Sequence, residues 1–202
     1  PENFTSKWES YFPFNVDFQK RGLKNKLQAA KRIFYSQEVK KRFMQLLETF
    51  KPDVIHLNNI HSQISPYIGE LAHKKGVKVV WTLHDYKLIC PSYSCLYKGK
   101  PCESCINKSL SNVLTKKCMK NSLPASFLAY LEALIWNRNR LNNNTDFFIA
   151  PSHFLKQKMT EGGFPQEKIK IIPNFTNREL PKIQIEKKDY YWFSFDILSC
   201  FI

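Results

Sequence analysis

The chain has 202 residues, of which 43% are hydrophobic, and a formal net charge of +14. This length and hydrophobic content suffice for one packed domain and exclude a disordered tail. No run approaches the 18 or so uncharged apolar residues that a membrane-spanning helix needs. The basic excess is dispersed as +5 over residues 1–50, +7 over 51–120 and +2 over the rest. Such a surface is either simply solvated or meets the phosphates of nucleic acid, anionic lipid or lipid-linked pyrophosphate.

The first predicted elements are helical. Residues 21–50 carry apolar side chains at nearly helical spacing, with basic residues between them, and predict one long helix or two. A Lys-Pro-Asp sequence ends this segment, and the apolar run 54–57 predicts a strand. Residues 62–75 then predict a helix that Gly76 closes, and residues 77–83 predict a second strand.

The alternation resumes after a long, cysteine-rich loop. Ser122, followed by Leu-Pro, opens a helix to about residue 143, and residues 146–150 predict a third strand. Ser152 is the predicted N-cap of the next helix, and residues 170–173 predict a fourth strand. Four alternations with short joins predict an α/β fold, a doubly wound parallel sheet with helices on both faces.

Polar residues follow the carboxyl end of each predicted strand. In doubly wound folds this edge of the sheet binds the ligand. The opposite strand ends carry ordinary turn residues, so the asymmetry favours a site. Its members are Asn58, Asn59 and His61 after the first strand, His84, Asp85 and Tyr86 after the second, Ser152 after the third and Asn174 after the fourth.

His84 and Asp85 carry the clearest chemistry. A histidine titrates near neutrality and can accept a hydroxyl proton, and an adjacent carboxylate can orient it or a substrate hydroxyl. The alternative is a hydrogen-bonded core histidine without a catalytic role. His56 lies within the first strand and is expected to pack in the sheet. Ser152 and the free amides of its helix offer a phosphate site, or Ser152 is a plain N-cap.

The loop between the second strand and the third helix is rich in cysteine. Cys102 and Cys105 are separated by two residues, so both thiolates can face one ion. With Cys90 and Cys118 they predict a structural zinc site that folds the loop. Disulfides, in an oxidising compartment, or free thiols remain the alternatives. The loop contains no histidine, which disfavours a catalytic zinc.

Four segments of the sequence resemble a known family in their order and spacing. They are residues 51–59, 82–86, 150–152 and 168–175. The family comprises retaining glycosyltransferases that use nucleotide sugars and have two Rossmann-like domains, the GT-B fold. The cysteine-bearing insertion at about 87–121 is similar to a loop of bacterial enzymes of capsule and O-antigen assembly.

The resemblance implies the acceptor-side half of a GT-B fold. It implies that His84 and Asp85 are catalytic and line the cleft between the two domains. It places Asn58, Asn59, His61 and Tyr86 on the acceptor and Ser152 and Asn174 on phosphate. The implied substrates are a nucleotide sugar and a saccharide or lipid-linked acceptor.

The resemblance also predicts a chain that is truncated at both ends. Residues 1–180 would form an incomplete N-terminal domain, and residues 181–202 a linker, the vestigial first strand of the donor-binding domain and an aberrant tail. The family's glycine-rich first loop and its paired glutamates have no counterpart in the sequence. We therefore expect the chain to lack activity without the missing C-terminal donor-binding domain.

Two further hypotheses concern partners. Aromatic residues beside basic ones suit a lipid interface, which predicts a cytoplasmic protein at the inner face of the membrane, unless they pack on their own domain. These residues are Phe4, Trp8, Tyr11, Phe12, Phe14 and Phe18, beside Lys20, Arg21, Lys24 and Lys26. The alternative from another class is a basic nucleic-acid-binding module with a structural zinc loop. The dispersed charge and the polar strand ends disfavour it.

Overall fold

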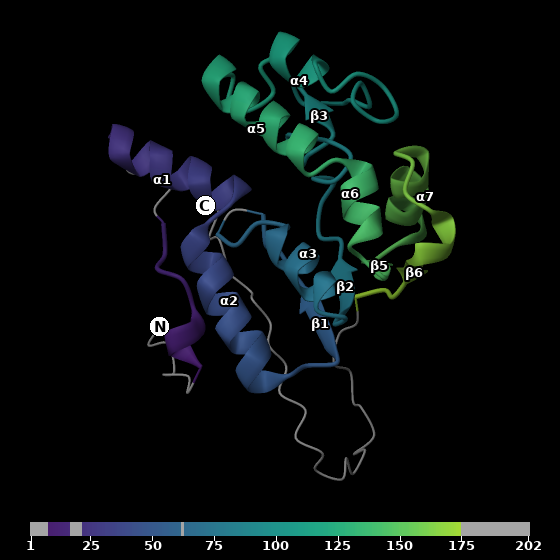
Figure 1. Ribbon diagram of the computed structural model, residues 1–202. Helices are drawn as coiled ribbons and strands as arrows, with labels where there is room; N and C mark the ends of the chain where they lie inside the picture. Colours follow the sequence, from purple (N-terminus) through teal and green to yellow (C-terminus); the bar gives the residue numbers. More distant parts are fainter. Residues whose placement is uncertain (1–7, 17–21, 62, 175–202) are drawn as a thin grey trace.

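The computed structural model describes residues 8–16, 22–61 and 63–174 (Figure 1). Its centre is a parallel sheet of four strands in the order β1-β2-β5-β6. Trp81 pairs with Leu57 on one side and with Phe148 on the other. The parallel sheet predicted from the alternation is confirmed. The strands are β1 Val54–Leu57, β2 Lys78–Thr82, β5 Phe147–Ala150 and β6 Ile169–Ile171.

The N-terminal helical segment is two helices, α1 Leu23–Phe34 and α2 Gln37–Phe50, after a short 3-10 turn, η1 Glu9–Tyr11. Ser36 separates them because its hydroxyl accepts a hydrogen bond from the Val39 N–H at 3.3 Å and so begins α2. The apolar side of α2 packs on α3, which spans Tyr67–Lys74. This helix begins later than the predicted residue 62.

One face of the sheet carries the core. Leu57, Trp81 and Phe148 lie in register on this face and are at most 3% exposed. Helices α3 and α7, the latter spanning His153–Glu161, pack against the strands. Gly69 of α3 permits this approach, because a Cβ there would lie 3.1 Å from Leu57 Cδ1. On the opposite face Phe147 remains 45% exposed, so the core of the described chain lies on one face of the sheet.

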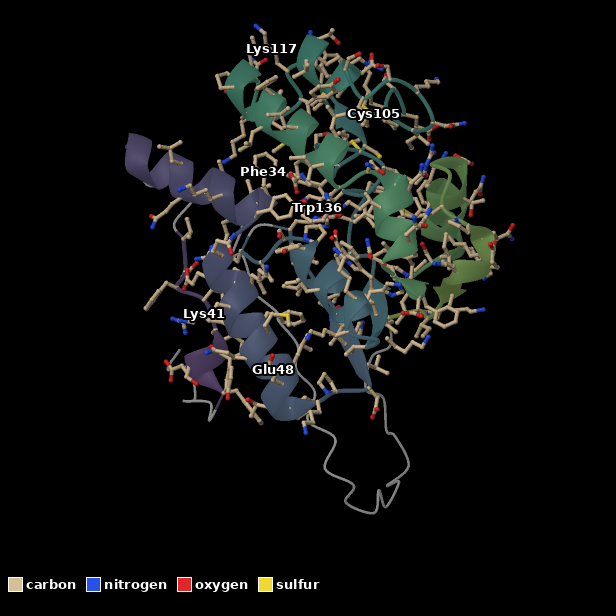
Figure 2. The ribbon with its side chains drawn as sticks, in the orientation of Figure 1. Phe34, Lys41, Glu48, Cys105, Lys117 and Trp136 are labelled. Atoms are coloured by element: carbon tan, nitrogen blue, oxygen red, sulfur yellow. The ribbon has the colours of Figure 1, made fainter. Side chains whose placement is uncertain are left out.

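The predicted helix to residue 143 is interrupted, giving α5 Leu123–Ile135 and α6 Arg138–Asn143. Asn137 begins α6 because its side-chain oxygen accepts from the Arg140 N–H at 3.1 Å. Trp136 is held between the helices, since its indole N–H donates to the Ile33 carbonyl at 3.3 Å and the Arg140 guanidinium stacks 4.2 Å from its ring. Figure 2 shows Trp136 close to Phe34 at the end of α1.

The cysteine-rich loop contains little regular structure. A hairpin of β3 Leu96–Tyr97 and β4 Lys100–Pro101 and the single-turn helix α4 Asn112–Thr115 were not predicted. Before β6 the chain makes a second 3-10 turn, η2 Gln166–Lys168. The loop packs beside α5, at the end of that helix where Figure 1 labels α4 and β3.

Candidate functional site

His84 and Asn58 meet at the carboxyl ends of two neighbouring strands. Asn58 directly follows β1 and is buried, and His84 lies two residues beyond β2 and is exposed. The His84 Nε2–H donates to Asn58 Oδ1 at 2.9 Å. This bond fixes the imidazole and leaves Nδ1 as the ring nitrogen with a lone pair, which can accept a proton or a hydroxyl hydrogen.

Asp85 lies beside this pair, partly buried. Its Oδ1 accepts a hydrogen bond from the backbone N–H of Lys87 at 2.7 Å. Burial raises the pKa of the carboxyl, while that hydrogen bond and the charges of Lys87 and His84 act in the opposite direction. A carboxyl group whose pKa is subject to these opposing effects can orient a hydroxyl or exchange a proton with it.

A buried ion pair connects the residues that follow β2 to helix α5. Lys87 Nζ lies 2.8 Å from Glu132 Oε2, and these side chains are only 13% and 8% exposed. The same ammonium donates to the Pro91 carbonyl at 3.0 Å, which ties the start of the cysteine loop to α5. Burial raises the pKa of Glu132, and Lys87 counteracts this shift. This pair was not predicted, although Glu132 is the single charge in an otherwise uncharged helix and so indicated a buried partner.

His61 does not join His84 but faces a cavity. The cavity has a volume of about 290 Å³ and is lined by His61, Lys87 and Glu132, together with residues of the cysteine loop, α5 and α6. The imidazole stacks near Trp81, with ring centres 5.4 Å apart, and its Nδ1 lies 3.9 Å from Glu132 Oε1. Burial, with a contribution from the charge of Lys87, lowers the pKa of His61 to about 3. The ring is therefore neutral, and its contact with Glu132 is not an ion pair.

The remaining strand-end residues differ in their burial and in their hydrogen-bond partners. Ser152 caps α7, because its hydroxyl accepts from the Leu155 N–H at 3.1 Å, which is the plain N-cap alternative. Asn59 has a positive φ of 44° and is exposed, and Asn174 is exposed after β6. Tyr86 is half-buried against the core, and its carbonyl accepts from the Cys90 N–H at 2.7 Å. His56 bonds to Thr82 within the sheet, as expected.

The four cysteines predicted to bind zinc come together in the fold. Cys90, Cys102, Cys105 and Cys118 all line one small cavity of about 10 Å³. They are free thiols, and Figure 2 shows Cys105 beside α5. Over residues 8–16, 22–61 and 63–174, however, no three His, Cys, Asp or Glu side chains are close enough to form a ready metal site. Cys102 instead lies beside Ser104 and the ammonium of Lys116.

Comparison with known proteins identifies the family. The sequence model of glycosyltransferase family 4 matches residues 12–180. The chain belongs to this family. Family 4 enzymes have the GT-B architecture and use nucleotide-sugar donors, so the α/β sheet is one Rossmann-like half of that fold. Family membership favours the glycosyltransferase interpretation over a nucleic-acid-binding module.

The chain is also similar to a curated protein. The chain is 28% identical over 132 residues to an uncharacterised 42.6 kDa protein in the cps region of Klebsiella pneumoniae. The match covers 64% of this chain and 29% of that protein, so the chain spans less than a third of the relative. No solved structure matches the chain. In the described residues, no helix is both long enough and apolar enough to cross a membrane.

Proposed function

We propose that this family 4 chain forms the acceptor side of an enzyme that transfers a hexose from a nucleotide sugar to a saccharide or lipid-linked acceptor in polysaccharide assembly. The bond between His84 and Asn58 is the observation that supports this best. It fixes an exposed imidazole at the carboxyl edge of the parallel sheet, where doubly wound folds bind their ligands. The cps-region relative supports the polysaccharide setting.

His84 and Asp85 are proposed to handle the acceptor hydroxyl. In the transfer, the hydroxyl oxygen forms a bond to the anomeric carbon, and the bond from that carbon to the diphosphate oxygen breaks. The nucleoside diphosphate leaves with the electron pair, and the hydroxyl proton passes to a base. His84 Nδ1 offers the lone pair for this proton, and Asp85 orients the hydroxyl. Asn59 and Tyr86 would border the acceptor, and Ser152 and Asn174 the phosphates.

The proposed site is tested by binding. Histidine side-chain NMR of the purified chain, titrated with nucleotide sugars and with short saccharides, should shift the His84 resonance. His73 is the matched control, because it is also an exposed histidine but lies near Asp146. Asp146 directly precedes β5 and so lies at the amino ends of the parallel strands, opposite His84. Shifts at His73 with none at His84 would place the ligand elsewhere and overturn the site.

Residues 1–202 by themselves are proposed to lack turnover, because the family match covers one Rossmann-like half and transfer needs both halves of the GT-B architecture. Incubation with UDP- and GDP-sugars and a lipid extract should release no nucleoside diphosphate above the background hydrolysis. Release that requires the chain and disappears in His84→Ala would refute the lack of turnover while supporting the site.

We also propose that Cys90, Cys102, Cys105 and Cys118 bind a structural zinc ion, because all four line one cavity. Binding would draw the sulfurs closer together than they lie in the free thiol form and release the thiol protons to solvent. Purified chain should contain about one zinc per molecule by elemental analysis. Cys102→Ser should lose the metal, whereas the matched variant Cys95→Ser should keep it. Equal zinc in both variants, or none in the native chain, would disprove the site.

A further inference from the structure

Helix α5 is apolar on the side that faces away from the protein. Its exposed side chains include Leu123, Phe127 and Leu134, which are 52%, 50% and 45% exposed. Its buried face instead carries small or polar residues, with Ser126 at 0% and Glu132 at 6% exposure. A helix at a water-facing surface normally has the opposite arrangement. The exposed face of α5 therefore has the character of a surface that meets an apolar partner.

Helix α1 extends this surface. Figure 1 shows α1 and α5 side by side, with the N-terminal ends of both helices projecting in the same direction, away from the sheet, and residue contacts join the two. Leu27, in the second turn of α1, is 56% exposed. Lys31 of α1 is exposed as well, as are Lys117 and Lys120 just before α5. Figure 2 places Lys117 beside the beginning of α5.

Helices α1 and α5 belong to two stretches of the sequence that carry most of the net charge of the chain. Residues 18–37 contain six Lys or Arg and residues 104–131 contain four, and neither segment contains Asp or Glu. Together they contribute +10 of the net +14. Of these basic residues, Lys31, Lys117 and Lys120 are exposed in the part of the chain that the structure describes, so the fold places basic charge beside the apolar face of α5.

Three acidic residues that border these segments, among those the structure describes, are already paired. Glu38 binds Arg32 at 3.0 Å and lies 3.4 Å from Arg42. Glu103 binds Lys158 at 2.6 Å, and Glu132 binds Lys87 at 2.8 Å. These carboxylates therefore do not neutralise the exposed lysines Lys31, Lys117 and Lys120.

We infer that the outward faces of α1 and α5 form a peripheral docking surface for an anionic lipid bilayer. Apolar side chains flanked by lysines, with the described carboxylates at their borders already paired, match the chemistry of the interface between anionic headgroups and acyl chains. Nucleic acid would use the lysines but would leave Leu123 and Phe127 exposed to water. A second copy of the chain would bring two basic surfaces together.

This surface differs from the aromatic cluster that the sequence suggested. Trp8 packs edge-on against Phe50, with ring centres 5.5 Å apart, and Tyr11 donates to Thr49. Phe14 is 75% exposed but lies under the Arg42 guanidinium. Of the remaining members of that cluster, Phe4, Phe18, Lys20 and Arg21 lie outside the described residues.

Vesicle flotation tests the inference. The chain should float with phosphatidylcholine vesicles that contain phosphatidylglycerol, and it should stay at the bottom with pure phosphatidylcholine. Leu123→Ser with Phe127→Ser should lower the partition coefficient by about tenfold or more, and so should Lys117→Glu with Lys120→Glu. Thermal unfolding verifies that these exposed substitutions leave the fold intact.

Matched controls lie elsewhere on the surface. Phe154→Ser removes a side chain that is 56% exposed on α7, and Lys40→Glu with Lys41→Glu reverses exposed charge on α2. Both should float like the native chain. Loss of flotation in the controls as well as in the α5 variants, or no loss in any, would overturn the inference. A dimer in solution that only the α5 apolar variant dissociates, or binding to nucleic acid that only the lysine variant abolishes, would also overturn it. Flotation requires no sugar transfer, so its result is independent of the proposed function.

Discussion

The strand ends and the cysteine loop adjoin each other but are built in different ways. At the strand ends, the parallel sheet fixes the backbone, so Asn58 and His84 become neighbours through strand pairing. The cysteine loop, residues 90–118, has only a two-residue hairpin and one helical turn. It is held by turns and by side chains that reach into the rest of the fold.

The difference is visible in the backbone. Among non-glycine residues of the loop, Tyr93, Cys95, Lys98, Asn107 and Lys117 adopt positive φ. The left-handed region costs L-residues roughly 1–2 kcal/mol each. The loop therefore requires compensating bonds at several positions, whereas Asn59 alone has a positive φ among the predicted strand-end residues, all of which the structure describes. Lys87 supplies one such bond, because its ammonium pairs with Glu132 of α5 and also donates to the Pro91 carbonyl in the loop.

The largest expected effect comes from breaking this pair. Glu132→Ala would leave the Lys87 ammonium buried without its carboxylate, which should lower the free energy of unfolding by about 3–5 kcal/mol in urea titrations. The double variant Lys87→Met with Glu132→Leu replaces both charges by apolar groups of similar size and should be close to neutral. A double variant as unstable as the single one would show that the charges themselves hold the two regions together. Glu161→Gln is the control and should leave the unfolding curve unchanged, because the Glu161 side chain is 37% exposed and Lys158 keeps Glu103 as a partner.

The residues at the strand ends are much easier to predict from the sequence than the side chains that hold them in place. Strand positions follow from short apolar runs between turn residues, and parallel order brings the residues after each strand to one edge, which is why Asn58 and His84 could be grouped. The four cysteines proposed to bind zinc could be grouped by their spacing alone. The partner of Lys87 could not, because Glu132 lies 45 residues away on a helix whose direction depends on packing. For the same reason the contact between α1 and α5 could not be predicted from the sequence.

A second, smaller effect is the pH dependence of stability that the partly buried His61 contributes. The folded pKa of His61, about 3, lies below the ordinary value of 6.5, so below pH 6.5 the unfolded chain takes up a proton that the folded chain does not. Stability is therefore lost as the pH falls from 6.5 towards 3, and at pH 5 the loss from this group is at most about 2 kcal/mol, since its side chain is 19% exposed. His61→Gln should remove this part of the pH dependence between pH 7 and 5 in urea titrations. An unchanged slope would mean that His61 is protonated in the fold.

The smallest effect concerns Asp85 and has the opposite sign. Burial raises the pKa of this carboxyl above its unfolded value. Between the two pKa values the folded chain holds a proton that the unfolded chain has already released, so stability falls as the pH rises through this range and levels off above the folded pKa. Asp85→Asn keeps an oxygen that accepts the Lys87 N–H and removes the charge. It should stabilise the chain by about 0.5 kcal/mol at pH 8 and by less at pH 4. A site that is kept for function can carry such a cost, whereas a purely structural carboxylate would lose stability on substitution. Destabilisation by Asp85→Asn at pH 8 would therefore assign Asp85 to the support of the fold and leave His84 as the single chemical group of the pair.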